Sequence, residues 1–350
     1  MQIKNLLLIG QFIPGSIERY FIEGLQKCGI GITTFDVAGQ YRNTIEKSVA
    51  NRIVNKISPH FFYRPLNERL VRFIQQKKYD VILVFKGMEL FPSTVKTLKR
   101  HAAILANFNC DHPFRFYSPG SGNNNVLNSI PSYDVHFSYA KSIVEQLKQK
   151  FSKDAYCIPF GFNSHIECPP GFASRSYKNR ILFIGDYDDD RASYLNRLKF
   201  KGLDIYGNLK WRTRNLLRPY VRTAYKNKPL FGSDYAKAAV SSTGIINLLR
   251  KQNIAEESHN MRTFEVPGYR GLLISQRTKE QLEYFEEDKE AIYFDTMDEL
   301  NDKLRYLCNN NAAVERIKQA GYERALQSNY SYDERSRQLF THLQYHFERQ

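Results

Sequence analysis

The fold class is decided by residues 4–28, which read KNLLLIGQFIPGSIERYFIEGLQKC. The stretch opens with an apolar run that ends at Gly10, and such continuous runs are typical of strands buried on both faces. The residues that follow place Ile17, Phe21 and Leu25 at helical spacing on one apolar face. The stretch therefore predicts one unit of strand, loop and helix.

The same unit recurs through the first half of the chain. Predicted strands cover 31–37, 80–87, 102–109 and 134–140, and predicted helices cover 67–78, 92–101 and 141–151. Because the strands are continuously apolar and alternate with helices, they predict a parallel, doubly wound sheet.

The pattern pauses in the Pro- and Gly-containing segment 158–179 and then restarts. Later predicted strands begin at about 180, 202, 244 and 291. We expect an α/β protein with two doubly wound, Rossmann-like lobes, at 1–160 and 179–330, joined by a linker at 161–178. A C-terminal helix at 331–350 is expected to pack back towards the first lobe. Ligands of such sheets bind beyond the carboxyl ends of the strands, which predicts a site in the cleft between the lobes.

Composition limits the partners. The chain of 350 residues is long enough for two domains and has a net charge of +15, which favours nucleic acid, an anionic lipid surface or phosphorylated small molecules. Its five cysteines form no C-x-x-C pair, so structural zinc and a disulfide framework are not expected. The first apolar run is too short for a signal peptide or a membrane span. We expect a cytoplasmic protein, with peripheral attachment to the inner face of the cell membrane as an option.

A second informative segment is EESHNMRTFEVPGYRGLLIS, residues 256–275. A helix is expected to begin near Asn260, with Glu265 about one turn in. Arg262 then lies at the helix start, where a positive charge opposes the helix dipole unless an anion binds there. The alternative is a capped helix with an exposed Arg–Glu pair, and the residues alone leave both options open.

This segment resembles the donor-binding signature of retaining glycosyltransferases of the GT-B fold, family 4, in which two glutamates flank seven residues. It is most similar to the spore-maturation-protein-like (CgeB-type) branch, and the similarity extends from about 180 to 335 through FIGDYDDDRASYL, DIYGN, YAKAAVSS and GIINLL in the same order. One departure is the pair Tyr269 and Arg270, where the family has a small residue or Gly. This pair would keep the turn's backbone further from the donor.

The resemblance implies a nucleotide-sugar donor as co-substrate, with no cofactor and no metal. It places Glu265 on the ribose hydroxyls and Glu257 near the sugar. Backbone amides around Asn260, Met261 and Arg262 would hold the diphosphate, and Arg262 would neutralise charge on the leaving phosphate.

The run GDYDDDR, residues 185–191, contains D-x-D at Asp188 and Asp190, which is the metal signature of the other glycosyltransferase fold. Its position between a strand and a helix favours N-capping instead. Gly185 would allow a phosphate to approach the backbone closely. Arg191 would either reach the same diphosphate or face solvent in the first helical turn.

In the first lobe, NFNCDHPFRFY at 107–117 follows a predicted strand. Pro113 restricts His112 to an extended conformation. CgeB-type proteins have an acidic-acidic-Pro turn here, and His112 replaces one acid. Asp111 would orient or deprotonate an acceptor hydroxyl, or it would cap the following turn. The loop at 11–16 would contact the acceptor or close over the donor.

Residues 199–228 hold nine Lys and Arg and one acid, Asp204. Aromatic and aliphatic residues interleave with the charges, and the helix should break near Pro219. The stretch fits an ordinary helix with a solvated basic face, an anionic membrane surface, or nucleic acid. The residues that would contact the anion are Arg212, Arg214, Arg218 and Arg222.

Together these features predict a glycosyltransferase that moves a sugar from a nucleotide sugar to a glycan or lipid-linked saccharide in cell-surface polysaccharide synthesis. The resemblance implies a retaining reaction, and Asp111, His112 and Glu257 are the candidate catalytic residues. The alternative is a non-catalytic basic module of the same fold that binds nucleotide or nucleic acid.

Overall fold

The computed structural model describes residues 2–117, 120–169, 171–198 and 200–350. The chain forms two compact units: unit 1 extends to Pro159 and includes Tyr332–Gln350, and unit 2 is Phe160–Ser331. The segment predicted as a linker is grouped with unit 2. Its Pro170 and the first residue of the basic stretch, Lys199, lie outside the described residues.

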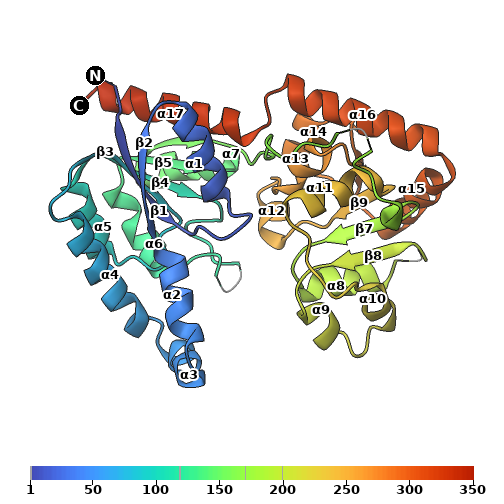
Figure 1. The fold of residues 1–350 in the computed structure, drawn as a ribbon, viewed down its shortest axis with the longest axis horizontal. Helices are drawn as coiled ribbons and strands as arrows, with labels where there is room; N and C mark the ends of the chain where they lie inside the picture. Colours follow the sequence, from blue (N-terminus) through green and yellow to red (C-terminus); the bar gives the residue numbers. More distant parts are fainter. Residues whose placement is uncertain (1, 118–119, 170, 199) are drawn as a thin grey trace. The chain divides into compact units, whose positions relative to one another are not determined.

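Unit 1 is built on a six-stranded parallel sheet in the order β2-β1-β3-β4-β5-β6 (Figure 1). The strands are β1 (Asn5–Gly10), β2 (Gly31–Asp36), β3 (Tyr79–Phe85), β4 (Ala102–Asn109), β5 (Val135–Ser138) and β6 (Asp154–Cys157). The helices are α1 (Ile17–Lys27), α2 (Val37–Glu46), α3 (Val49–Ile57), α4 (His60–Ile74), α5 (Pro92–Lys99), α6 (Asn124–Ser129), α7 (Lys141–Phe151) and α17 (Tyr332–Glu348). A 3₁₀ turn spans Ile130–Ser132.

The C-terminal helix α17 packs on α1 within unit 1. The Tyr20 and Tyr332 rings stack with centroids 4.9 Å apart. Gly24 is required here because a Cβ at this position would lie 2.3 Å from the Ser336 hydroxyl. The last helix of the chain therefore completes the core of unit 1.

Unit 2 has a five-stranded parallel sheet in the order β11-β10-β9-β7-β8. The strands are β7 (Ile181–Ile184), β8 (Leu203–Tyr206), β9 (Gly244–Asn247), β10 (Leu273–Gln276) and β11 (Ile292–Phe294). The helices are α8 (Asp189–Asn196), α9 (Lys210–Thr213), α10 (Pro219–Ala224), α11 (Gly232–Ser241), α12 (Lys251–Ala255), α13 (Arg262–Gly268), α14 (Lys279–Tyr284), α15 (Met297–Asn309) and α16 (Asn311–Gln327), with a 3₁₀ turn at Arg175–Tyr177. Two parallel α/β sheets confirm the predicted fold class.

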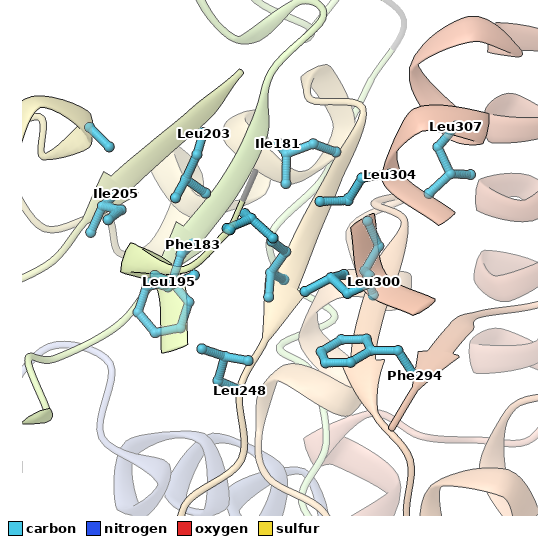
Figure 2. Packing of buried hydrophobic residues seen from close by; sticks show 14 of the residues in the cluster. Ile181, Phe183, Leu195, Leu203, Ile205, Leu248, Phe294, Leu300, Leu304 and Leu307 are labelled. Carbon is cyan, nitrogen blue, oxygen red and sulfur yellow. The ribbon is translucent and has the colours of Figure 1, made fainter. Parts of the chain in front are cut away.

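The core of unit 2 joins its sheet to α15 (Figure 2). Ile181 and Phe183 of β7 pack in one cluster with Leu300 and Leu304 of α15, and all four side chains are buried. Burial of each such side chain stabilises the fold by about 1.5–3 kcal/mol. This cluster fixes the strands whose ends carry the candidate site.

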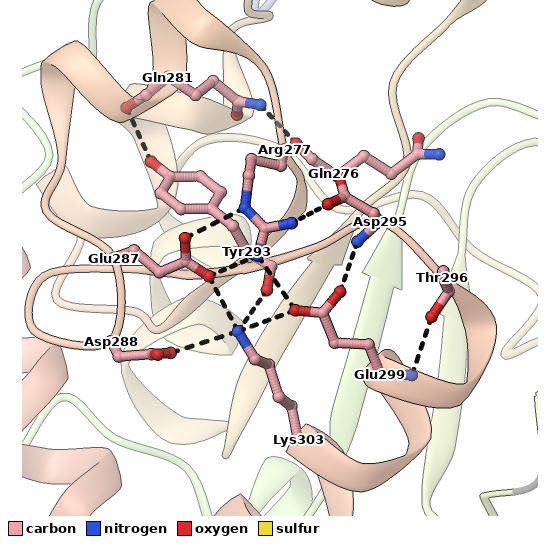
Figure 3. A network of polar contacts seen from close by, with 10 residues as sticks. All are labelled: Gln276, Arg277, Gln281, Glu287, Asp288, Tyr293, Asp295, Thr296, Glu299 and Lys303. Carbon is pink, nitrogen blue, oxygen red and sulfur yellow. Dashed lines mark hydrogen bonds and ion pairs between the residues drawn. The ribbon is translucent and has the colours of Figure 1, made fainter.

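A paired charge network lies after β10 and β11 (Figure 3). The Arg277 guanidinium donates to both Glu287 oxygens, at 2.6 and 3.1 Å, and to Glu299 at 3.0 Å. Lys303 donates to Glu287 at 3.0 Å. Although burial raises the pKa of Glu299, hydrogen bonds from the Asp295 amide, Arg277 and Lys303 hold it at about 2. In this network each cation has carboxylate partners, so its role is to brace the sheet ends against α15.

Candidate functional site

The start of α13 is held at the carboxyl end of β9. The Asn260 and Asn247 side-chain amides exchange hydrogen bonds of 2.8 and 3.1 Å. His259 is fully buried, and its Nε2 accepts the Phe160 amide at 3.3 Å. The ring proton therefore lies on Nδ1, which donates to Glu280 at 2.7 Å. The segment is thus positioned rigidly before the helix begins.

The backbone amides of α13 already have acceptors. The Arg262 amide donates to the Asn260 side chain at 3.0 Å, and the Thr263 amide donates to the Asn260 carbonyl at 3.1 Å. The amides of Phe264 and Glu265 both donate to the Met261 carbonyl at 3.0 Å. These four amides are therefore already paired within the helix start. That amides around Asn260, Met261 and Arg262 hold a diphosphate stays a prediction.

Two guanidinium groups lie at neighbouring strand ends. Arg191 of α8 is buried, and its Nε and Nη2 donate to the Leu248 carbonyl at 3.0 and 2.7 Å. The Arg262 Nε donates to the Ile184 carbonyl. Because β7 and β9 are adjacent parallel strands, both carbonyls lie at the same edge of the sheet. The option that Arg191 faces solvent is therefore wrong.

The guanidinium groups at this edge are not neutralised. Burial, with the positive charges of Arg262 and Arg250, lowers the pKa of Arg191 to about 9, and the nearby Asp188 and Asp186 offset this only in part. Within the described ranges, no carboxylate forms an ion pair with Arg191 or Arg262. Like charges held together in a partly buried place raise the free energy of the empty site, and an anionic ligand would lower it.

Gly185 makes room for Arg262. A Cβ at this position would lie 3.0 Å from an Arg262 guanidinium nitrogen. The space beside Gly185 that was predicted to admit a phosphate is thus occupied by the Arg262 side chain, which would itself bind the phosphate. A pocket of about 130 Å³ adjoins Gly185 and Arg262 and is also lined by Leu230 and by Phe231, whose side chain is 63% exposed. Since a water occupies about 30 Å³, the pocket has room for about one aromatic ring.

Glu265 is a half-buried carboxyl group beside the arginines. Burial raises its pKa to about 7, although Arg262 acts in the opposite direction. In the part of the chain that the structure describes, no group donates a hydrogen bond to this carboxyl group, and the buried Tyr235 hydroxyl near it also lacks a partner. Such groups are costly unless a ligand supplies the missing hydrogen bonds.

Glu257 is separate from this group. Its side chain is exposed, and it accepts the Lys279 amide at 3.1 Å at the start of α14. The structure thus gives it a capping role, and its place near the sugar stays a prediction.

The unusual pair after α13 packs within unit 2. The Tyr269 hydroxyl accepts the Asn163 amide at 3.2 Å, and the Arg270 guanidinium lies 4.4 Å from the centre of the Tyr322 ring. The bulk of Tyr269 and Arg270 is accommodated by this packing.

The aspartates after β7 cap a helix. Asp188 accepts the amides of Asp190 and Arg191 at 3.0 and 3.2 Å, which confirms the predicted N-cap of α8. Asp190 forms an ion pair with Lys251 at 2.9 Å. Among the residues that the structure covers, no three His, Cys, Asp or Glu side chains gather as they would around a metal ion. Metal independence remains a prediction.

Unit 1 has a pocket of about 480 Å³ at the carboxyl end of its own sheet. Its polar lining includes Glu18, Lys86 and Glu89. Burial raises the pKa of Glu18 to about 7 against hydrogen bonds that include one from the Gln11 amide, and burial also raises the pKa of Glu89. Lys86 is the counter-charge, and it forms an ion pair with Asp111 at 2.6 Å.

The structure separates the two first-lobe candidates. Asp111 pairs with a residue that lines the unit 1 pocket. His112 is fully buried, its Nδ1 accepts the Phe114 amide at 3.4 Å, and its ring packs edge-on against the Phe114 ring. The structure gives the His112 ring a packing contact, and a catalytic role for it stays a prediction.

The basic stretch is broken at Pro219, as predicted, into α9 and α10. Arg218 is half-buried and donates to Ser193 at 2.9 Å and Asn215 at 3.2 Å, so it joins α10 to α8 rather than facing an anion. The exposed cations of the predicted set are Arg212, Arg214 and Arg222. Three leucines of the stretch are exposed, at 61% for Leu209, 68% for Leu216 and 94% for Leu217.

Among the described residues, no helix has the length and apolar character needed to cross a membrane.

Sequence reasoning missed several residues at both sites, namely Glu18, Lys86, Glu89, Phe231 and Arg250. Lys86 had a usable signal, because it directly follows an apolar strand and precedes Gly87. Glu18 had none, since it lies in a predicted amphipathic helix where a glutamate is ordinarily solvated.

Comparisons with known proteins fit this architecture. Residues 191–341 match the family described as glycosyl transferase-like. No curated protein matches the chain in sequence. Among solved structures, sucrose-phosphate synthase from Thermosynechococcus elongatus is similar with a TM-score of 0.74 at 10% identity, covering 99% of this chain and 100% of that one.

Two further structures are similar in fold. Anabaena HepE in complex with UDP-glucose has a TM-score of 0.65 at 12% identity, covering 97% of this chain and 99% of that chain. A UDP-N-acetylglucosamine 2-epimerase has a TM-score of 0.59 at 15% identity, with 100% and 98% covered. The chain thus has the two parallel-sheet α/β lobes of the GT-B fold seen in these structures, and its residues 191–341 are similar to the glycosyl transferase-like family.

Proposed function

We propose that this protein transfers a sugar from a nucleotide-sugar donor to a saccharide acceptor. The observation that carries the proposal is the group of guanidiniums without carboxylate partners at the ends of β7 and β9, beside the carboxyl group of Glu265. A nucleoside diphosphate fits this combination, because its phosphates supply negative charge and its ribose supplies vicinal hydroxyls.

Four side chains would each contact one part of the donor. Arg191 and Arg262 bind the diphosphate, and the ionised Glu265 accepts hydrogen bonds from the ribose hydroxyls. Phe231 packs against the base at the mouth of the small pocket. The HepE structure contains UDP-glucose, which makes a uridine donor the first to test.

The acceptor sugar would occupy the unit 1 pocket. Glu18 and Glu89 accept hydrogen bonds from its hydroxyls, and Asp111 positions Lys86 between them. In the retaining reaction, the acceptor oxygen forms a bond to the anomeric carbon and the bond from that carbon to the phosphate oxygen breaks. The leaving diphosphate takes the acceptor proton while Arg191 and Arg262 stabilise its charge. No protein base and no metal ion are required.

We further propose that the acceptor is lipid-linked and belongs to cell-surface polysaccharide synthesis at the inner face of the membrane. Support comes from the exposed leucines of the basic stretch, which adjoin Arg212, Arg214 and Arg222. Replacing these three arginines by Gln should weaken binding to vesicles that contain phosphatidylglycerol, measured by flotation. Wild-type protein that stays free of such vesicles contradicts this part.

The activity test separates the enzyme from a non-catalytic module. Calorimetry with UDP, GDP, ADP and CDP identifies the nucleotide, and release of that nucleotide from its sugar conjugates is then followed with and without saccharide acceptors. Turnover that requires Glu265 supports the enzyme. Tight nucleotide binding without any release of diphosphate supports the non-catalytic alternative.

A further inference from the structure

Helix α3 exposes its apolar side chains to solvent, whereas a surface helix normally exposes its polar ones. None of its nine residues is buried. Val49, Ile53 and Ile57 recur every four residues and are 69%, 55% and 80% exposed. Val54 and Phe61 extend this apolar stripe, at 38% and 69% exposure.

The polar side of α3 faces the protein. The Asn51 side-chain Nδ2 donates to the Thr44 carbonyl at 2.7 Å, and the Tyr41 hydroxyl donates to the Asn55 side-chain oxygen at 2.6 Å. An ordinary surface helix has the opposite orientation, with its apolar stripe against the core. The hydrogen bonds of Asn51 and Asn55 hold the polar face of α3 against α2. The apolar stripe on the opposite face therefore points outward. In Figure 1, α3 lies at the end of α2 that is remote from the sheet of unit 1.

Positive charge borders the stripe. Lys47, Arg52 and Lys56 are exposed, and no acidic residue occurs from 47 to 67. On a helix of 3.6 residues per turn, Arg52 and Lys56 lie along one edge of the row formed by Val49, Ile53 and Ile57. Apolar side chains beside basic ones are typical of helices that lie in the interface of an anionic bilayer.

We infer that α3 and Phe61 form a membrane-surface contact that inserts into the headgroup region of an anionic bilayer. Self-association is a poorer fit, because a stable dimer buries about 1,200–2,000 Å² and this stripe belongs to a single short helix with basic flanks. The inference rests on the proposed attachment to the membrane and adds to it a contact on unit 1. Asn55 of α3 also lines the acceptor pocket, so a lipid-linked saccharide held at this surface would have its sugar end near that pocket.

The test is vesicle flotation with phosphatidylcholine alone and with added phosphatidylglycerol. We expect wild-type protein to float only with the anionic vesicles. The double variant Ile53→Ser/Ile57→Ser should bind at least about tenfold more weakly, because each isoleucine loses its burial in the bilayer. The variant Arg52→Gln/Lys56→Gln should lose the preference for phosphatidylglycerol.

The comparison variant is Leu209→Ser/Leu217→Ser, which removes exposed apolar residues of the membrane contact proposed for unit 2. If this variant loses vesicle binding while the isoleucine variant binds as the wild type does, the inference for α3 is wrong and the attachment through unit 2 survives. Dimerisation in light scattering that the isoleucine variant abolishes, without vesicle binding, would also overturn it. Each variant is also titrated with UDP. Because these exposed side chains lie outside the donor site, UDP affinity should not change, and failure of the membrane inference can be told from failure of the donor proposal.

Discussion

The two parallel sheets carry opposite electrostatics at their carboxyl ends. In unit 2, Arg191 and Arg262 occupy neighbouring strand ends without carboxylate partners. In unit 1, the corresponding edge carries Glu18 and Glu89 around Lys86, whose charge is matched by Asp111. A protein with a net charge of +15 thus has an acid-lined pocket in one unit and, in the other, a cationic edge that nearby aspartates offset only in part.

The difference teaches that topology fixes where a ligand can bind while side chains decide what binds. Both edges offer the ends of parallel strands, where ligands of such sheets are found. The cationic edge suits a diphosphate. The unit 1 pocket, which Glu18, Glu46 and Glu89 line together with Arg42 and Lys86, suits hydroxyl groups. The Arg277 network offers an internal reference, because its guanidinium is fully paired and has a bracing role.

The largest expected effect comes from replacing Arg262, the arginine proposed to bind the diphosphate, and comparing it with the bracing arginine Arg277. Arg262→Met should weaken UDP binding by about 2–3 kcal/mol, or about a hundredfold, because a charged hydrogen-bond donor to the diphosphate is lost. Its melting temperature should change little, since its removal also relieves repulsion with Arg191. Calorimetry and thermal unfolding measure both quantities.

The control Arg277→Met should behave in the reverse way. It leaves Glu287 and Glu299 without their main partner and should reduce the free energy of unfolding by about 2–3 kcal/mol. UDP affinity should be preserved where the variant is folded. If both arginine variants lower stability equally and neither changes UDP affinity, the distinction between bracing and binding arginines is wrong.

The second effect is the pH dependence of donor binding. Because the pKa of Glu265 is about 7 in the free protein and the ribose hydroxyls require the ionised form, UDP affinity should fall by about tenfold per pH unit below pH 7. It should reach a plateau above pH 7. Glu265→Gln should bind UDP more weakly at pH 8 and should lose the pH dependence that comes from protonation of Glu265. The pH dependence that comes from the UDP phosphate should be the same in both proteins. Parallel pH profiles for the two would contradict the ribose role.

The third effect is the pH dependence of the free energy of unfolding that arises from Glu18, a buried carboxyl group of the unit 1 pocket. The folded-state pKa of Glu18, about 7, lies above its ordinary value of 4.5. The stability linked to its protonated form is therefore complete below about pH 4.5 and is lost as pH rises through 7. At pH 8, Glu18→Gln should be more stable than the wild type by about 1–2 kcal/mol, and this gain should vanish near pH 5.

Chemical denaturation at both pH values measures this difference. The matched control is Glu68→Gln, which alters an exposed carboxylate of α4 in the same unit and should be neutral at both. A gain for Glu18→Gln that does not depend on pH would mean that burial of the charged form is not the cause.

The smallest effect concerns the base. Phe231→Ala should weaken UDP binding by about 1 kcal/mol, roughly fivefold, because one aromatic contact is lost. Inorganic pyrophosphate, which has no base, should bind this variant and the wild type equally in a competition assay. An equal loss for pyrophosphate would show that Phe231 acts on the phosphates or on the fold.

The fold was predictable because continuous apolar runs such as 4–10 and 80–87 specify buried parallel strands directly. Arg262 and Glu265 could be grouped from the sequence because they are three residues apart, which is about one helical turn, and their roles in donor binding stay predictions. The contacts that determine their environment were not predictable, since Arg191 bonds Leu248 across the sheet and no local pattern encodes that distance. Helix α3 was not among the predicted elements, and its periodicity alone would not have shown which of its two faces packs.

The central claim is that the cationic edge of unit 2 recognises a nucleoside diphosphate. The most direct measurement is calorimetric titration of the wild-type protein with UDP, GDP, ADP and CDP, each compared with its nucleoside. We predict that one diphosphate binds at least about a hundredfold more tightly than its nucleoside, and that Arg262→Met removes most of this difference. Absence of binding by all four diphosphates, or equal affinity for a diphosphate and its nucleoside, would contradict the account.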